Sequence, residues 1–112
     1  IKYLKGDSEK IKNNLTGFIR IGNKKYLEEL LESGIDLNYS EKSRYPPLHT
    51  AILLGNYEIV KLLLNKKADP KFKNYRGKTG IDLAEEKLKK SKLASKKIEY
   101  QKILDLLKQY SK

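Results

Sequence analysis

The middle of the chain carries two short runs of regularly spaced apolar residues, with Gly55 between them. The first run begins at Pro47, and proline is well tolerated in the first turn of a helix. Glycine readily adopts the positive φ that ends many helices, so Gly55 predicts the end of the first helix. The apolar positions are Leu48, Ala51 and Ile52 in the first run and Ile59, Val60, Leu63 and Leu64 in the second. This spacing predicts two amphipathic helices, and helices this short are stable only when they pack against neighbours.

The same pattern recurs along the chain with a regular period, which is the spacing between Gly22 and Gly55. One period after Pro47 the chain reaches Gly80 in a later segment. One period before the second run, its apolar positions correspond to Leu27, Leu30 and Leu31. Self-similarity at such a period indicates a tandem repeat, in which each unit buries its apolar face against the next one.

Two segments carry a resemblance to a known family. Residues 47–51 read Pro-Leu-His-Thr-Ala, which is similar to the Thr-Pro-Leu-His-x-Ala signature of the ankyrin repeat. Residues 77–84 read Gly-Lys-Thr-Gly-Ile-Asp-Leu-Ala, which resembles a variant of the same signature. Pro46 stands where the signature has threonine, so the hydroxyl group that commonly meets the histidine ring is absent.

The resemblance to ankyrin repeats covers residues 15–110, and it implies the fold and the mode of action. The expected fold is an all-α ankyrin-repeat solenoid of helix–turn–helix units with projecting β-turn fingers. Segments Asp36–Arg44 and Asp69–Lys78 are the expected fingers, and their Pro, Asn and Gly residues suit turns. The resemblance also implies non-enzymatic recognition of a protein partner in the concave groove.

The length of 112 residues predicts a single ankyrin-repeat domain, residues 1–112. Its expected units are an N-terminal cap at about 8–37, a regular repeat at 38–70 and a C-terminal cap at 71–112. Within the first cap, helices are expected at 8–21 and 24–33.

The last unit departs from the regular period. Ile103 aligns with Ile59 at an offset of 44, which predicts an insertion of 11 residues between Glu86 and Tyr100. The insertion has no Gly or Pro, so the preceding helix should run on by a turn or two and bend near Ser91 to Ser95. Deletion of 87–97 is expected to leave a folded stack.

The composition indicates which kinds of partner and which compartment suit the chain. The net charge is +11, and only three of the 25 basic residues are arginine. This balance raises nucleic acid, anionic membrane or an acidic protein as partners, although lysines spread over helix faces also suit a solvated surface. The chain lacks cysteine, which fits a reducing compartment. A cytoplasmic location is therefore favoured over that of a secreted effector.

Candidate catalytic groups lack partners in the sequence. His49 is the only histidine, and the ankyrin resemblance implies that it hydrogen-bonds backbone in a turn. Glu28, Glu29 and Glu32 share no pattern typical of an acid–base pair. The glycines are explained as helix ends or turns, without a phosphate-binding loop. We therefore expect no enzyme activity, no catalytic residues, no cofactor, no metal and no small-molecule substrate.

Aromatic and basic residues gather in the two expected fingers, and two leucines lie at the end of the first central helix. Tyr and Arg are enriched at binding hot spots. The predicted partner-binding residues are Arg44, Tyr45, Leu53, Leu54, Tyr75, Arg76 and Lys78. Leu54, Tyr45, Tyr75 and Arg76 are expected to form the centre of this site. The protein is expected to be a monomer that binds a protein partner of acidic character.

Two other functions remain open from the sequence. The family resemblance extends to small ankyrin proteins that act as immunity proteins or inhibitors against bacterial toxins, besides regulatory or host-directed bacterial ones. The lysine-rich segment 87–97 could instead make the chain a basic adaptor to nucleic acid or anionic membrane. Aromatic residues do not interleave these lysines, which disfavours stacking on single-stranded nucleic acid.

Overall fold

The computed structural model describes residues 15–32, 34–39 and 45–112. Residues 15–21 are helical, whereas the first part of the expected helix 8–21 lies outside the described residues. The remaining helices are α2 (Lys24–Leu31), α3 (Pro47–Leu54), α4 (Tyr57–Asn65), α5 (Gly80–Lys90) and α6 (Ala94–Tyr110). The expected helix 24–33 therefore ends earlier, at Leu31.

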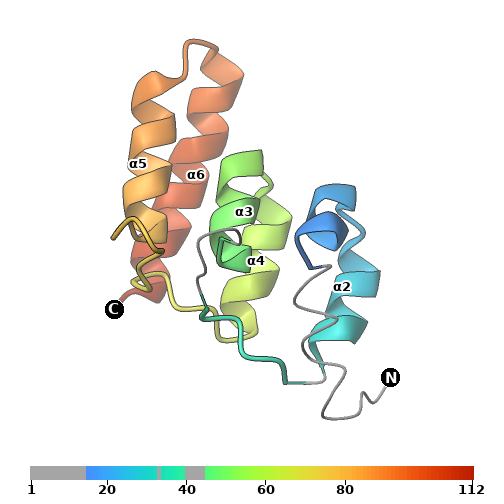
Figure 1. Cartoon of the computed structure of the whole chain (residues 1–112). Helices are drawn as coiled ribbons and strands as arrows, with labels where there is room; N and C mark the ends of the chain where they lie inside the picture. The colour runs from blue at the N-terminus through green and yellow to red at the C-terminus, as the bar shows by residue number, and fades with distance from the viewer. Residues whose placement is uncertain (1–14, 33, 40–44) are drawn as a thin grey trace.

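The helices form antiparallel pairs that stand side by side (Figure 1). The pairs α3–α4 and α5–α6 pack internally, and α3 packs on α5 while α4 packs on both α2 and α6. One layer therefore contains α3 and α5, and a second layer contains α2, α4 and α6. Within the described residues, the finger segments form turns and extended backbone, and no strand is present.

The apolar positions predicted from the spacing form the core between these layers. Every residue of the two central stripes is buried, and so are Leu27, Leu30 and Leu31 one unit earlier. Tyr100, Ile103, Leu104 and Leu107 of α6 are also buried and close the far end of the core. Burying these side chains stabilises the stack, because each contributes about 1.5–3 kcal/mol on full removal from water.

Local geometry repeats with the same period as the apolar positions. Gly22 and Gly55 have φ of +76° and +71°, and each lies just past the end of a helix. The next residues, Asn23 and Asn56, cap α2 and α4, because each side-chain oxygen accepts a hydrogen bond from the N–H three residues on. The repeat is thus encoded in helix ends as well as in apolar positions.

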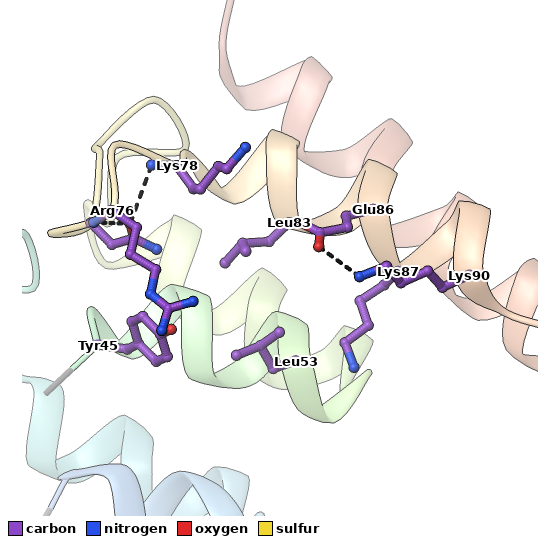
Figure 2. Close-up of a pocket in the computed structure, with 9 residues that line it drawn as sticks. Tyr45, Leu53, Arg76, Lys78, Leu83, Glu86, Lys87 and Lys90 are labelled. Carbon is purple, nitrogen blue, oxygen red and sulfur yellow. Dashed lines mark hydrogen bonds and ion pairs between the residues drawn. The ribbon is translucent and has the colours of Figure 1, made fainter. Parts of the chain in front are cut away.

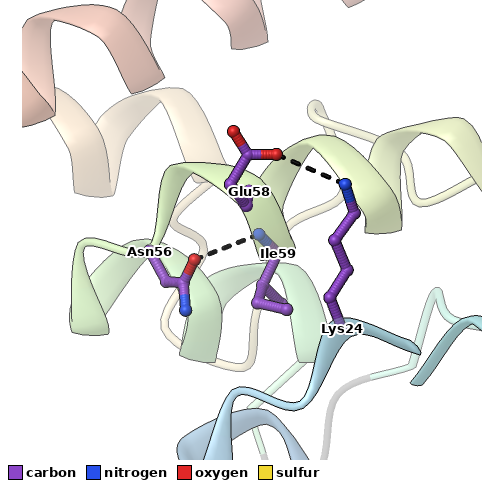
Figure 3. A network of polar contacts seen from close by, with 4 residues as sticks. All are labelled: Lys24, Asn56, Glu58 and Ile59. Atoms are coloured by element: carbon purple, nitrogen blue, oxygen red, sulfur yellow. Dashed lines mark hydrogen bonds and ion pairs between the residues drawn. The ribbon is translucent and has the colours of Figure 1, made fainter. Parts of the chain in front are cut away.

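Figure 3 shows how neighbouring units meet at the cap of α4. Lys24 at the start of α2 forms an ion pair with Glu58 in the first turn of α4, with 3.4 Å between Nζ and Oε2. Asn56 accepts the hydrogen bond of Ile59 N–H at 3.2 Å beside it. The ion pair is exposed and so contributes little to stability, whereas removing such a cap typically costs about 1 kcal/mol.

The finger loops are tied to each other by a side chain. The Asn38 side chain accepts a hydrogen bond from Asp69 N–H at 2.8 Å and donates one to the Lys67 carbonyl at 3.3 Å. Asp36 and Asp69 each accept a hydrogen bond from the N–H two residues on, at 2.9 Å in both cases. These turns fix the direction in which each finger leaves its helix.

The α5–α6 hairpin is longer than the α3–α4 pair. Helix α5 begins with a capping box, in which Thr79 and Asp82 exchange hydrogen bonds between side chain and backbone. The Thr79 backbone N–H lowers the pKa of the Asp82 carboxyl, because it donates to the charged form. The hairpin turns at residues 91–93, and its tip extends beyond α3 and α4 (Figure 1). Among the described helices, none has the length and apolar character needed to cross a bilayer.

Candidate protein-interaction site

A pocket of about 310 Å³ opens between α3, α5 and the finger turn that precedes α5 (Figure 2). Its wall combines apolar, aromatic and charged side chains from all three segments. They are Tyr45, Leu53, Asn74, Arg76, Lys78, Leu83, Glu86, Lys87 and Lys90. A concave site with an apolar wall and a few polar groups is the usual form of a binding site.

The apolar part of the wall comes from the two layered helices. Leu53 of α3 and Leu83 of α5 are both half-buried and lie on either side of the pocket (Figure 2). Their partial exposure leaves apolar surface that a bound side chain would cover. Covering it would favour association, since removal of apolar surface from water is the dominant favourable contribution in most protein complexes.

An aromatic pair borders the pocket beside the finger. The rings of Tyr45 and Tyr75 stack, with 5.8 Å between their centroids and 25° between their planes. The Arg76 guanidinium lies 5.7 Å from the centre of the Tyr75 ring, and its Nε donates to the Tyr75 hydroxyl at 3.3 Å. Tyr45 precedes α3 and Tyr75 precedes α5, so this pair joins two successive units.

The finger turn that carries Arg76 and Lys78 is held by the buried side chain of Asn74. Its Oδ1 accepts hydrogen bonds from the backbone N–H groups of Arg76 at 2.8 Å and Lys78 at 3.2 Å. The Asn74 backbone N–H also donates to the Lys78 carbonyl at 2.8 Å. Gly77 completes the turn with φ of +76°, which a side chain would disfavour. The two cations are thus presented by a fixed turn.

The buried His49 ring contacts the Asn74 side chain. The Asn74 Nδ2 lies 3.3 Å from His49 Nδ1, and because Asn74 Oδ1 is occupied as an acceptor, its amide donates to the ring. His49 is therefore neutral with its proton on Nε2, an atom without a hydrogen bond of good geometry among the described residues. Burial lowers the pKa of His49 to about 4, against smaller opposing effects of the Phe72 backbone and the Asp82 charge. The sequence analysis expected a bond to backbone in the turn; the Phe72 backbone acts on the pKa of His49 as a hydrogen-bond partner, and the Asn74 side chain is a further partner at Nδ1 that was not expected.

Positive charge dominates the pocket rim. Arg76, Lys78, Lys87 and Lys90 face a single carboxylate, Glu86. The Lys90 ammonium donates to Glu86 Oε1 at 2.9 Å, and this contact lowers the pKa of the Glu86 carboxyl. Glu86 is therefore charged and paired, and the remaining cations leave the pocket suited to anionic groups.

The structure brings together four of the seven predicted site residues. Tyr45, Leu53, Arg76 and Lys78 line the pocket, and Tyr75 stands beside them in contact with Tyr45 and Arg76. Leu54, one of the four residues expected at the centre, is 39% exposed but does not line the pocket; its neighbour Leu53 does. Arg44 lies outside the described residues.

The sequence analysis missed the contribution of α5. Leu83, Glu86, Lys87 and Lys90 line the pocket from this helix, and none was predicted as a site residue. A signal for three of them was present, because Leu83, Glu86 and Lys87 lie one repeat period after Thr50, Leu53 and Leu54. The groove face of one unit predicts that of the next.

The described residues that line the pocket include one carboxylate, Glu86, and no histidine. Glu28, Glu29 and Glu32 lie on or just after α2 and do not line it. Across the described residues, His, Cys, Asp and Glu side chains form no group of three that could hold a metal ion. The only histidine is buried under the finger turn, away from solvent.

Paired helices stacked at a regular period, with finger turns between the pairs, define a helical solenoid of the protein-binding kind. A family model described as "Ankyrin repeats (3 copies)" matches residues 2–74. The chain belongs to the ankyrin-repeat family. Ankyrin repeats generally mediate protein–protein interactions and are typically non-enzymatic modules.

The alignments with curated relatives cover about half of this chain. A transient receptor potential cation channel subfamily A member 1 homolog of Caenorhabditis elegans is 42% identical over 66 residues, which are 58% of this chain and 6% of that protein. Inversin of Gallus gallus is 39% identical over 56 residues, covering 50% of this chain and 5% of inversin. The human 2-5A-dependent ribonuclease is 37% identical over 59 residues, covering 52% of this chain and 8% of that enzyme. The chain thus spans a small fraction of each relative. No solved structure matches it.

Proposed function

We propose that this chain is a non-enzymatic interaction module that binds an acidic segment of a protein partner in the pocket between α3 and α5. The observation that carries the proposal is the pairing of a half-buried apolar wall, Leu53 and Leu83, with a rim in which cations outnumber carboxylates. An apolar centre inside a polar rim is the usual arrangement of a protein interface.

Each part of the pocket has a role in this proposal. An apolar side chain of the partner would cover Leu53 and Leu83, while its carboxylates would meet Lys78 and Lys87 on the rim. The stacked pair of Tyr45 and Tyr75 offers a rigid surface, and tyrosines at such positions often dominate binding energy. The exposed cations would speed encounter with an acidic partner more than they would tighten the complex.

The same proposal includes the division of the chain into repeat units. It treats 8–37 as an N-terminal cap, 38–70 as a regular repeat and 71–112 as a C-terminal cap with an insertion of 11 residues. The helix ends at Asn23 and Asn56 support this period, and the lengths of α5 and α6 support an elongated last unit. The pocket then lies between the regular repeat and the C-terminal cap.

Selection of binding peptides from a random display library on the full chain tests the pocket. Enriched peptides should contain Asp or Glu next to an apolar residue. Leu53→Arg should weaken their binding at least tenfold, because it places a bulky cation where the apolar side chain docks. Leu54→Arg is the matched control one residue along, and its effect should be smaller because Leu54 does not line the pocket.

A second pair of variants tests the rim without disturbing the apolar wall. Arg76→Ala should slow association of the selected peptides, whereas Lys61→Ala, an equal change of charge on the exposed face of α4, should not. Circular dichroism on each variant would establish that the fold is intact. If the enriched peptides lack acidic residues, or if Leu53→Arg binds them with full affinity, the partner site lies elsewhere.

A further inference from the structure

The tip of the α5–α6 hairpin combines lysines with exposed aliphatic side chains, and of these residues only Lys90 also lines the binding pocket. Its residues, here called the hairpin tip, are Lys89, Lys90, Lys92, Leu93, Lys96, Lys97 and Ile98. All five lysines are exposed, and Leu93 and Ile98 are 65% and 63% exposed. Exposed apolar residues close in sequence to a cluster of lysines fit an interaction site better than a role in packing.

Geometry keeps these residues out of the stack. Helix α6 has 17 residues, against 9 in α4, the helix on which it packs. At 1.5 Å per residue the difference is roughly 12 Å, and Figure 1 shows the tip standing clear of α3 and α4. The buried residues of α6 begin only at Tyr100, so its first turns contribute nothing to the core.

The turn that forms the tip has a defined local structure. The Ser91 backbone N–H and hydroxyl both bond the Lys87 carbonyl, at 3.0 Å and 2.7 Å, and end α5. The Leu93 carbonyl accepts from Lys97 N–H at 3.0 Å and starts α6. Leu93 is therefore fixed at the very end of the hairpin, and Ile98 follows in the first turns of α6.

Charge at the tip is strongly one-sided. Residues 87–97 contain no acidic residue. Of the nearest carboxylates along the chain, Glu86 is paired with Lys90, Glu85 lies on α5 before the tip, and Glu99 is half-buried on α6 after it. The four lysines other than Lys90 thus lie within a few residues of Leu93 and Ile98 along the chain, and all six side chains are exposed.

We propose that the hairpin tip docks the protein on an anionic phospholipid bilayer. Leu93 and Ile98 enter the interface between headgroups and acyl chains, and the lysines contact the headgroups of anionic lipids. Apolar insertion and basic residues together give stable but reversible attachment where either alone is weak. Nucleic acid is the poorer match, because the tip offers aliphatic side chains rather than aromatic rings or arginine forks.

Co-sedimentation of the full chain with vesicles tests the proposal. Vesicles of phosphatidylcholine with phosphatidylserine should bind the chain, whereas phosphatidylcholine alone should not, and binding should weaken as salt is raised. The double variant Leu93→Ser with Ile98→Ser should lower partition to anionic vesicles roughly tenfold through lost apolar contact. Ile21→Ser is the matched control, because Ile21 is 76% exposed at the opposite end of the stack.

The contribution of charge needs its own control. Lys96→Gln with Lys97→Gln should weaken binding to anionic vesicles several-fold more than Lys61→Gln with Lys71→Gln, an equal loss of charge on α4 and the second finger. No binding to anionic vesicles, or equal effects of the two lysine pairs, would overturn the proposal. If the variant Leu93→Ser with Ile98→Ser still binds anionic vesicles, and a DNA duplex displaces it from them, the hairpin tip is a general polyanion-binding surface instead. All substituted side chains are exposed, so thermal unfolding should remain unchanged.

Discussion

The contact between His49 and Asn74 supports the finger turn that forms part of the pocket rim. Asn74 Oδ1 holds the backbone of the turn carrying Arg76 and Lys78, and the His49 ring accepts the amide hydrogen of the same side chain and so helps to orient it. A protonated His49 would present N–H to N–H at this point. The neutral, buried histidine thus supports the side chain that holds the rim.

A pH dependence of stability follows from the low pKa of His49. The pKa falls from 6.5 in the unfolded chain to about 4 in the folded one. Between these values the unfolded state binds the proton and the folded state does not, so stability is full above pH 6.5 and declines as the pH falls toward 4. The loss is on the order of 3 kcal/mol.

Chemical denaturation from pH 7 to pH 4 measures this loss. His49→Gln should be less stable at pH 7 but should show a much flatter dependence between pH 6.5 and 4.5, because the titrating group is gone. The lowered pKa values of Asp82 and Glu86 contribute a slope at lower pH that both proteins share. Equal slopes in the two proteins would show that His49 does not titrate in this range.

Residues also show where sequence analysis succeeds and where it stops. The buried stripes were predictable because helical spacing alone decides which side of a helix faces its neighbour. Leu53 and Leu54 are adjacent and chemically identical, so only the rotation of α3 against α5 decides which one lines the pocket. The contacts of Tyr45 with Tyr75 and of His49 with Asn74 join separate units, and no local pattern indicates them.

Among the elements, the helix ends distinguish one unit from the next. Gly34 follows α2 with φ of +78°, and one period later Lys67 follows α4 with the same φ of +78°. Lysine has a Cβ that disfavours this left-handed region by roughly 1 kcal/mol, whereas glycine is free to adopt it. The second unit therefore keeps the geometry of the first at a cost in stability.

Lys67→Gly should relieve this strain and raise the free energy of unfolding by about 0.5–1 kcal/mol. Lys66→Gly is the matched control, because the preceding lysine has φ of −96° and gains nothing from glycine. It should lower stability by a few tenths of a kcal/mol through the greater freedom of the unfolded chain. Thermal melts of both variants compare their stabilities with that of the unsubstituted chain. A lower stability of Lys67→Gly would show that Lys67 is not strained.

At the scale of the whole molecule, stability should vary along the stack. Helix α4 has neighbours on both sides, α2 and α6, in addition to its partner α3. The hairpin tip lies beyond the other units and contributes no side chain to the core. Solenoids respond to such differences unit by unit, because their interactions are between nearest neighbours.

Hydrogen exchange on the native protein should reveal this order. Amides of α3 and α4 should exchange most slowly, and those of the first turns of α6 should exchange faster than those near Ile103. A boundary in protection near residue 98 would support treating 87–97 as an insertion. Uniform protection across the described helices would instead indicate a single cooperative unit.

The organisation at this scale was the most predictable of all. The repeat period, two signature segments and the offset of 44 at Ile103 indicated the order of helices and the long last hairpin before any contact was known. The period does not predict the shape of the space between two units. The pocket depends on side chains of different length at equivalent positions, such as Leu53 and Glu86.

Packing between neighbours also has a consequence for how the chain acquires its structure in time. Short-range contacts close small loops and so favour rapid folding, and each pair can dock on the previous one as it leaves the ribosome. Helix α6 also makes contacts of much longer range. The hydroxyl of Tyr100 bonds the Leu53 carbonyl 47 residues back, and that of Tyr110 bonds Asn65 across 45 residues. These contacts form only after α6 has been made, so α6 docks later than α3 and α4, and the side of the core that it covers stays open to solvent until it docks.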